Sequence, residues 1–380
     1  MLFLFGLLFL FVFALRSRAA ETGVSSADLI STNATLWTES MLWDEEGDVS
    51  SGVGYNNNIL LSATNRQGSA FYVNGLDFVV TRLPIDGWQV VGAVIADDIR
   101  YWRNVGTGSE DSFVASLTVE RELPAGWQAG LELRDLYEKE VLDITTSEGV
   151  AAPTLVQGYG ITEEPYVRKN LPAGFWLKLE MPVTRWLLAG PLDDYWDFGP
   201  VVTAGCELGS RADVSISYGV SYQQHDEWLA LNDEDEQLPQ RLDIFQQSVE
   251  LAWHQYWDAN RHWQSSTKLS YSKREDNGAG YFNYSQYQAV EDLHWQSDGW
   301  DIKGSAQIAY EDYPVQNPGV LNGQTLYREL LDFSLEVERR LYKNLKGFSK
   351  VEYQRAISNF INDGDDYTGT TVSGGLRLAF

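Results

Sequence analysis

The chain has little of several things, and each scarcity excludes a class of protein. Cys206 is the single cysteine among 380 residues, which excludes an internal disulfide framework. Only 28 basic residues stand against 54 acidic ones, and the net charge of −26 argues against binding nucleic acid or an anionic membrane surface. Beyond residue 20 no run approaches the ~18 consecutive apolar residues of a transmembrane helix, so a helical membrane protein is excluded.

Motifs that carry common chemistry are also missing. The sequence contains no Walker motif, dinucleotide fingerprint or zinc-ligand spacing, and no nucleophile motif surrounds any serine. The four histidines, His225, His254, His262 and His294, are the only candidates for acid–base work near neutral pH. The acidic runs 232–236 and 362–366 lack the spaced ligands and turn glycine of a calcium loop, although divalent bridging between loops stays open. We therefore expect no cofactor, no metal site and no enzymatic activity.

The first residues have the composition of an export signal. Residues 1–15 are almost wholly Leu, Phe, Val and Ala, and 16–20 read Arg-Ser-Arg-Ala-Ala, a small-residue site suited to signal-peptidase cleavage. The pattern predicts a signal peptide over residues 1–20. An uncleaved N-terminal anchor is the alternative interpretation.

A short turn recurs along the chain and divides it into strands. Residues 83–88, 123–127 and 171–175 each read Leu-Pro, then Gly, then an aromatic residue, and four related joints follow. Those joints are 209–213, 258–262, 297–300 and 342–345, which makes seven short turns. Eight opposite connections alternate with them, at 63–68, 103–111, 138–157, 189–194, 225–241, 275–280, 312–325 and 359–369. The count predicts sixteen strands, with fourteen to eighteen also compatible.

Strict alternation of apolar and polar residues marks the later strands. In 300–311 every second residue from Trp300 to Tyr310 is apolar or small, and 331–341 shows a similar split. Many segments run beyond ten residues with aromatic ends, which is longer than soluble strands and suits a tilted crossing of lipid. The 14 tryptophans and 20 tyrosines fit aromatic belts at two lipid–water interfaces. The sequence predicts an all-β fold, a transmembrane antiparallel β-barrel with short periplasmic turns and longer extracellular loops.

The end of the chain and its overall layout carry a resemblance. Leu376, Leu378 and Phe380 alternate with other residues up to the last position, which resembles the signal that barrel-assembly machinery recognises. Residues 52–380 as a whole resemble a bacterial outer-membrane β-barrel of porin-like size. The resemblance implies localisation in the bacterial outer membrane, with outer-membrane lipid and the assembly machinery as partners. Residues 21–51 are then a periplasmic N-terminal tail or a partial plug.

Charged residues on the polar face of the predicted strands are the candidates for a functional surface inside the barrel. In one interpretation, the opposite charges set up an electric field across the lumen that selects solutes. In the other, the side chains only keep the inner wall hydrated and cross-linked. The candidates are Glu132, Arg134, Glu250, Lys268, Asp301, Lys303, Glu336, Glu338, Arg340, Lys350, Glu352 and Arg377.

Two functions fit this arrangement. The first hypothesis is a channel for passive diffusion of small hydrophilic solutes, because a wall of sixteen strands commonly leaves an aqueous pore. The alternative is a surface or assembly barrel with a closed lumen, which binds a partner through its extracellular loops or assists lipoprotein or surface-protein export. The pattern specifies neither a solute nor an oligomeric state.

Overall fold

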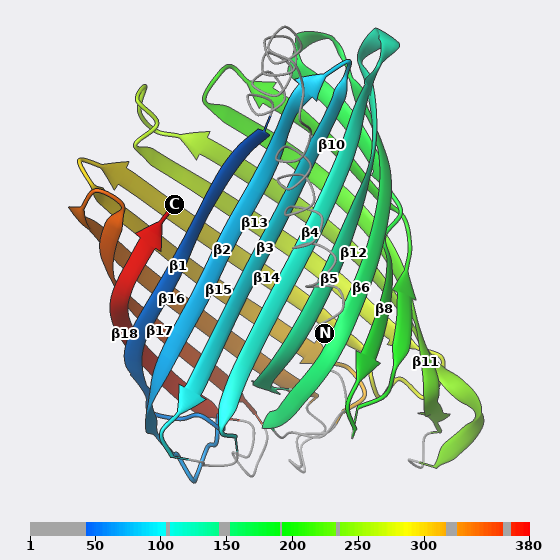
Figure 1. Cartoon of the computed structure of the whole chain (residues 1–380). Helices are drawn as coiled ribbons and strands as arrows, with labels where there is room; N and C mark the ends of the chain where they lie inside the picture. Colours follow the sequence, from blue (N-terminus) through cyan, green and yellow to red (C-terminus); the bar gives the residue numbers. More distant parts are fainter. Residues whose placement is uncertain are drawn as a thin grey trace, which may run out of the picture.

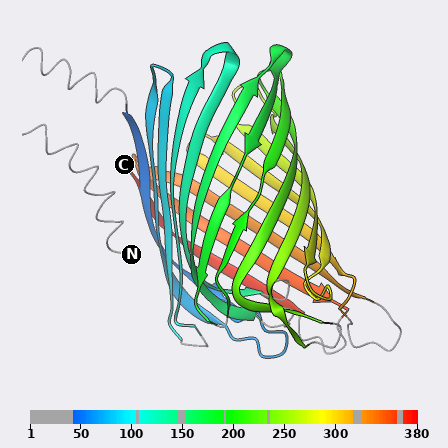
Figure 2. The same cartoon turned by 90° about the vertical axis from the view of Figure 1, so that its right-hand side faces the viewer.

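The computed structural model is a closed antiparallel β-barrel (Figures 1 and 2). It describes residues 43–103, 107–143, 153–190, 192–232, 236–316, 325–359 and 366–380. The strands are β1 (Trp43–Asn56), β2 (Ser69–Ile85), β3 (Trp88–Tyr101), β4 (Ser109–Leu123), β5 (Trp127–Asp143), β6 (Pro153–Asn170), β7 (Phe175–Glu180), β8 (Val183–Leu188), β9 (Tyr195–Phe198), β10 (Val201–Leu208), β11 (Ala212–Leu231), β12 (Gln237–Tyr256), β13 (Trp263–Asp276), β14 (Tyr284–Ser297), β15 (Trp300–Tyr313), β16 (Leu326–Tyr342), β17 (Leu345–Ser358) and β18 (Tyr367–Ala379). No helix in these ranges is long and apolar enough to cross a membrane.

Two crossings of the barrel are interrupted at prolines. β7 and β8 pair with β6 in one continuous register and form a single crossing broken at Pro182. β9 and β10 likewise continue one another across Pro200. Proline has no backbone N–H to give to the ladder, so the hydrogen bonding lapses there while the strand continues. The predicted barrel of sixteen strands is confirmed.

The seven predicted short turns all lie between consecutive strands at one end of the barrel, here called the turn end. Asp86-Gly87 and Asp298-Gly299 form two-residue hairpins in which both residues have positive φ, between 48° and 84°. This is the type I′ geometry, which matches the twist of the strands and favours Asp-Gly. The longer connections gather at the opposite, loop end. In an outer-membrane barrel the turn end faces the periplasm.

The first strand begins earlier than predicted. β1 starts at Trp43, which pairs with Arg82 of β2, whereas the sequence interpretation placed the start near Gly52. Residues 43–51 are polar at most positions, with Asp44, Glu46 and Asp48 on the inner face of the strand. A segment with so few apolar residues predicts a tail rather than a membrane strand. The predicted signal peptide 1–20, and the part of the predicted tail or plug over 21–42, lie outside the described residues.

The two longest predicted loops, 138–157 and 225–241, are shorter than predicted because their flanking strands pair beyond the lipid belt, whereas the connection predicted at 63–68 begins earlier, after Asn56. β5 continues to Asp143 and β6 resumes at Pro153, within the loop predicted at 138–157. β11 continues to Leu231, within the loop predicted at 225–241. The alternation of apolar and polar residues ends where the strand leaves the lipid. The backbone hydrogen bonding between strands continues beyond that point. Residues 233–235 and 362–365 of the two acidic runs lie outside the described residues.

The barrel closes between its first and last strands. β18 pairs with β1 from Asp48 opposite Ala379 to Asn56 opposite Thr371. Beyond this ladder, the N–H of Phe380 donates to the carbonyl of Gly47 (2.8 Å) and the N–H of Gly47 donates back (3.3 Å). Leu376, Leu378 and Phe380 are exposed on the outer face, between 48% and 63%. Their role as an assembly signal stays a prediction.

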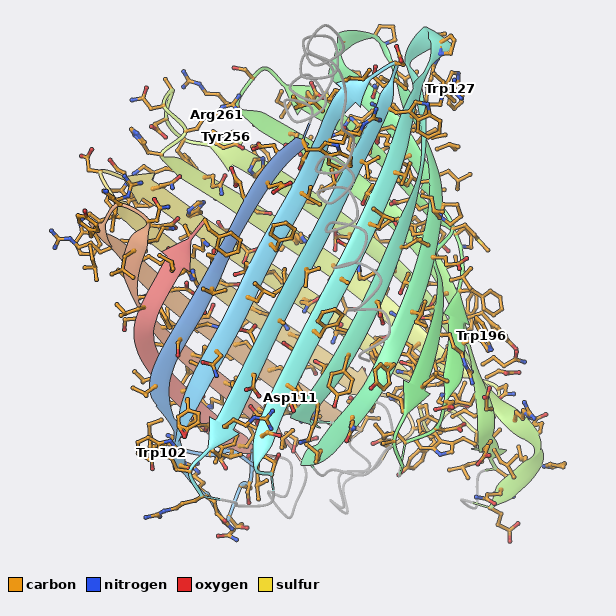
Figure 3. The ribbon with its side chains drawn as sticks, viewed as in Figure 1. Trp102, Asp111, Trp127, Trp196, Tyr256 and Arg261 are labelled. Carbon is orange, nitrogen blue, oxygen red and sulfur yellow. The ribbon has the colours of Figure 1, made fainter. Side chains whose placement is uncertain are left out.

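The outer face has an apolar belt between two rings of aromatic residues. Figure 3 shows Trp127 at the turn end and Trp102 at the loop end. Along β5 the exposed face runs from Trp127 through Leu131 and Leu133 to Tyr137, whose ring packs 4.8 Å from that of Tyr159 on β6. About ten residues of a tilted strand match the apolar band of an outer-membrane barrel.

Carboxylates interrupt this belt at several positions, among them Asp135 of β5, Glu291 of β14 and Glu163 of β6. Glu163 is exposed on the outer face of β6, directly opposite Leu133 of β5, midway between Trp127 and Tyr137. It makes no ion pair within 4.0 Å with any residue that the structure describes. We expect Glu163→Leu to raise the free energy of unfolding by about 1–2 kcal/mol, because acidic side chains facing lipid at mid-depth are unfavourable. Urea unfolding of the protein in phospholipid vesicles measures this change.

The neighbouring Glu164 provides a matched control. It faces the interior, where it is opposite Glu132, and Glu164→Leu should give no gain because that position is not in contact with lipid. A loss of stability in Glu163→Leu, together with a change in oligomeric state, would contradict the expectation and place Glu163 in a contact between subunits.

Candidate functional site

The strand register identifies the inner face of the wall. Residues directly opposite one another on paired strands share a face, and faces alternate along each strand. The face opposite the aromatic rings carries Ser50 and Arg377 at the closing seam, and Lys346 continues it on β17. All twelve predicted residues occupy this inner face: Glu132 and Arg134 on β5, Glu250 on β12, Lys268 on β13, Asp301 and Lys303 on β15, Glu336, Glu338 and Arg340 on β16, Lys350 and Glu352 on β17, and Arg377 on β18. Their effect on solutes stays a prediction.

Arg377 is the centre of an ion-pair network across the closing seam. Its guanidinium contacts Asp48 of β1 (3.3 Å), Glu336 of β16 (3.0 Å) and Glu338. Lys346 Nζ lies 2.9 Å from the second oxygen of Glu338, whose side chain is only 2% exposed. The network therefore ties four strands together near the turn end.

The remaining predicted residues form separate pairs or none. Arg134 pairs with Glu132 (2.5 Å) and Lys350 pairs with Glu352 (2.7 Å), each along one strand. Asp301 lies 2.8 Å from His294. Glu250, Lys268, Lys303 and Arg340 make no ion pair within 4.0 Å with residues in the described ranges. The structure thus brings some of the set together and leaves others facing the lumen singly.

Charge is unevenly distributed around the inner wall. The inner face of β1–β5 carries the carboxylates of Asp44, Glu46, Asp48, Asp77, Asp97, Glu110, Glu120, Glu122, Glu132, Glu138 and Glu140. Arg134 is the one basic residue among the described inner positions of these strands. By contrast, the inner face of β13–β18 carries most of the lysines and arginines, including Lys303 and Lys350. The wall is therefore acidic on one side and of mixed charge on the other.

Sequence interpretation missed the acidic side of this wall. Asp48 lay in the supposed tail, and Asp77 and Asp97 stand in strands with apolar residues on both faces, so their register could not be read. The available signal was the presence of aspartate, at Asp77 and at Asp97-Asp98, inside otherwise apolar segments, which is rare unless the position faces water.

Aromatic rings on the inner face lie against glycines of the neighbouring strand. A Cβ on Gly205 would lie 2.3 Å from the Trp176 ring, and one on Gly130 would lie 2.3 Å from that of Tyr166. Phe71 over Gly54, Trp186 over Gly160 and Phe348 over Gly375 repeat the arrangement, each between directly opposite residues. Close ring-to-backbone packing of this kind depends on glycine. It keeps large side chains along the wall rather than across the lumen.

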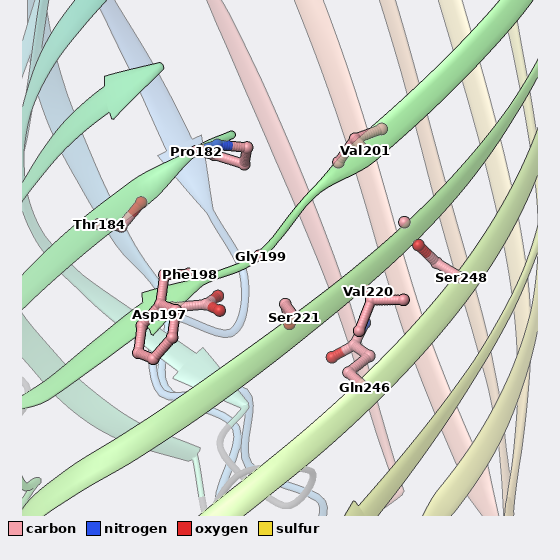
Figure 4. A pocket seen from close by; sticks show the side chains of 11 residues that line it. Pro182, Thr184, Asp197, Phe198, Gly199, Val201, Val220, Ser221, Gln246 and Ser248 are labelled. Carbon is pink, nitrogen blue, oxygen red and sulfur yellow. The ribbon is translucent and has the colours of Figure 1, made fainter. Parts of the chain in front are cut away.

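A hollow in the inner wall coincides with the interrupted strands. It has a volume of about 110 Å³ and is lined by Pro182, Gly199, Gly219 and their neighbours. Figure 4 shows the bare ribbon at Gly199 between the side chains of Asp197 and Val201. A Cβ on Gly199 would lie 1.9 Å from the carbonyl oxygen of Val220, so this position requires glycine. The hollow widens the lumen locally.

Each histidine is paired with an aspartate. The pairs are His225–Asp193 (3.4 Å), His254–Asp213 (3.2 Å), His262–Asp258 (3.2 Å) and His294–Asp301 (2.8 Å). In the turn at 257–262, a hydrogen bond from the N–H of Trp263 holds the pKa of Asp258 below its usual value. No hydrogen bond from a serine to these rings is found within the described residues, and those residues contain no cluster of three or more metal-ligating side chains.

The loop end of the interior is partly packed. Leu242, Ile244 and Phe282 are buried together, and Trp228 and Tyr281 pack against them. Asp276 holds the turn that carries Phe282, because its carboxylate accepts hydrogen bonds from the N–H groups of Gly278, Gly280 and Phe282 at 2.7–3.0 Å. On β15 and β16, Glu311 and Arg328 are each 1% exposed. These groups narrow the mouth at the loop end beside β11–β16.

These features define the class of protein. A closed antiparallel sheet with an apolar belt, aromatic rings at both edges and a charged interior is a transmembrane β-barrel. The chain is a bacterial outer-membrane β-barrel of porin-like size.

Comparison with known proteins does not narrow this class to a family. No family model and no curated protein matches the chain. Among solved structures, OccAB1 of Acinetobacter baumannii is 8% identical, with 89% of this chain and 97% of that one covered and a TM-score of 0.46. OccAB3 of the same organism is 8% identical, with 89% of this chain and 99% of that one covered and a TM-score of 0.47. The anion-selective porin from Comamonas acidovorans is 12% identical, with 89% of this chain and 99% of that one covered and a TM-score of 0.42. Similarities of this size say nothing about solute or mechanism.

Proposed function

We propose that the barrel is a channel for passive diffusion of small hydrophilic solutes across the outer membrane. The observation that carries this proposal is the exposed, charged inner wall. Arg134 is 50% exposed, Glu352 is 41% exposed and Lys350 is 38% exposed, although all three point into a closed barrel. Side chains that filled the interior would bury one another, and a wall of sixteen strands is wide enough to leave water between them.

Passage would depend on size and charge, with no residue in a covalent role. The acidic inner face of β1–β5 would concentrate cations at the wall, because a low-dielectric barrel focuses the field of its charges. The channel should therefore prefer cations to anions of equal size.

A barrel with a closed lumen and a binding role at its loops is the second candidate. The packed residues at the loop end favour it, since Ile59, Phe71 and Tyr313 are at most 2% exposed. These buried residues lie at the loop end, Phe71 on β2 and Tyr313 on β15. The inner wall farther from that end, at Arg134 and Lys350, stays exposed. We therefore rank this candidate second.

Planar-bilayer recording of the refolded protein separates the two candidates. We expect stable ohmic steps in symmetric KCl, and a reversal potential in a KCl gradient with the sign of a cation-preferring channel. Low ionic strength should strengthen the preference because screening is weaker. Silence from protein that migrates as a folded barrel before heating would contradict the channel and support the closed lumen.

A further inference from the structure

Part of the inner wall is apolar yet exposed. Val79 on β2 is 40% exposed and Ile95 on β3 is 46% exposed, and both belong to the inner face by register. Ala93, Val114 and Leu136 extend this surface to β4 and β5, because Ile95 is opposite Val114 and Val114 is opposite Leu136. We call these five residues the apolar floor. A wall that met only water and ions would not be expected to carry a contiguous apolar surface.

Carboxylates border the apolar floor. Asp77 lies directly opposite Ile95, and Asp97 follows Ile95 by two residues on the same face of β3. Asp48 is opposite Asp77 on β1. Neither Asp77 nor Asp97 makes an ion pair within 4.0 Å with a described residue, so both carboxylates face the lumen unneutralised at close range.

Basic groups lie at the margin of this region rather than on it. Lys350 of β17 interacts electrostatically with Asp97, but its ammonium is paired with Glu352 at 2.7 Å. Arg377 of β18 also interacts electrostatically with Asp97, but its guanidinium contacts Asp48, Glu336 and Glu338. Arg134, which comes two residues before Leu136 on the inner face of β5, is paired with Glu132. Each of these three cations is therefore already paired with another carboxylate, and the border of the floor stays acidic.

We propose that the apolar floor and its aspartates bind small organic cations that carry an apolar group, as these cations pass through the lumen. The apolar group would lie on Val79 and Ile95, while the ammonium would lie beside Asp77 and Asp97. Charge complementarity selects the cation, and burial of the apolar group on the floor distinguishes it from a plain inorganic ion. This inference rests on the proposed channel function and names its preferred class of solute.

Three probe ions test the proposal in planar bilayers. Benzyltrimethylammonium carries both features, tetramethylammonium lacks the apolar ring, and benzenesulfonate carries the ring with the opposite charge. Added to one side in KCl, benzyltrimethylammonium should produce resolvable current blockades. Tetramethylammonium should give blockades about fivefold shorter, as expected for the area of one ring left unburied, and benzenesulfonate should give none.

Two sets of variants separate charge from apolar contact. Asp77→Asn combined with Asp97→Asn should shorten the benzyltrimethylammonium blockades about tenfold, because two partly screened attractions are removed. Val79→Thr combined with Ile95→Thr keeps the β-branched shape and should shorten only the benzyltrimethylammonium blockades. Asp332→Asn, an inner-face carboxylate on β16 away from the floor, is the matched control and should leave both ions unchanged.

The outcomes distinguish this inference from the channel itself. Absence of KCl steps from the folded protein would overturn the channel and this inference together. Normal KCl steps with equal blockades by the two cations, or with blockades unaffected by the aspartate variants, would overturn this inference alone. Blockades that arise only after residues 21–42 are deleted would also overturn it, since the floor would then be covered by that segment in the full chain.

Discussion

Gly375→Ala is expected to destabilise the closed barrel by about 3 kcal/mol. Gly375 lies on β18 opposite Gly52 of β1, where the two strands close the sheet. A Cβ at position 375 would lie 2.2 Å from the carbonyl oxygen of Ser51 and 2.6 Å from the Cα of Gly52. Both are backbone atoms that cannot rotate away, so the ladder itself must shift. The fraction of protein that keeps folded-barrel mobility on gels at increasing temperature, and urea unfolding in vesicles, measure the loss.

The preceding glycine is the control for this prediction. Gly374 lies on the same strand and at the same seam, but a Cβ there would be 3.2 Å from the nearest atom, the carbonyl oxygen of Phe348. Gly374→Ala should therefore cost no more than about 1 kcal/mol. Equal stability of the two variants would show that the seam is looser than this geometry requires.

The contrast between water and lipid made much of the fold predictable. Along β15 and β16 one face meets lipid and the other meets the wet lumen, so the residues alternate strictly and the strands could be located within a few residues. The turns were predictable for a separate reason, because Asp-Gly and Pro-Ala-Gly supply the backbone angles that tight hairpins need. Residues 43–51 and the strand ends beyond the lipid belt have neither an alternating pattern nor a turn sequence. The sequence therefore predicts tail or loop at those positions.

The candidate site was less predictable than the fold. Alternation could place Glu336, Glu338 and Arg377 on the inner face one by one. The contact of Arg377 with Asp48 depends on closure of the barrel, which brings β18 and β1 together over more than three hundred residues of sequence, and its contacts with Glu336 and Glu338 reach across β17. Asp77 and Asp97 were missed because β2 and β3 are apolar on both faces, and a strand of that kind has no readable register. The surface proposed to select solutes is thus the part that breaks the alternation rule.

Arg328→Met is expected to destabilise the protein by about 3–5 kcal/mol, the usual cost of breaking a buried ion pair by removing one partner. Arg328 on β16 and Glu311 on β15 are each 1% exposed, and their charged groups lie 3.9 Å apart. Glu311 also accepts hydrogen bonds from Tyr313 (2.9 Å) and Gln286 (2.8 Å). Those two neutral donors remain in the variant, but they do not replace the charge of the guanidinium. Urea unfolding in vesicles, compared with Lys303→Met, gives the measurement.

Lys303 is a suitable control because it is an inner-face cation that is exposed, and its substitution should change stability by less than about 0.5 kcal/mol. The double variant Glu311→Gln with Arg328→Met should recover at least half of the loss, since it also removes the negative charge of the buried carboxylate at 311. A glutamine at 311 can still accept from Gln286 and can donate to the hydroxyl of Tyr313, which is both donor and acceptor. If Arg328→Met and Lys303→Met were equally mild, the loop end would be open to water at this point, and the packed mouth would not restrict the channel there.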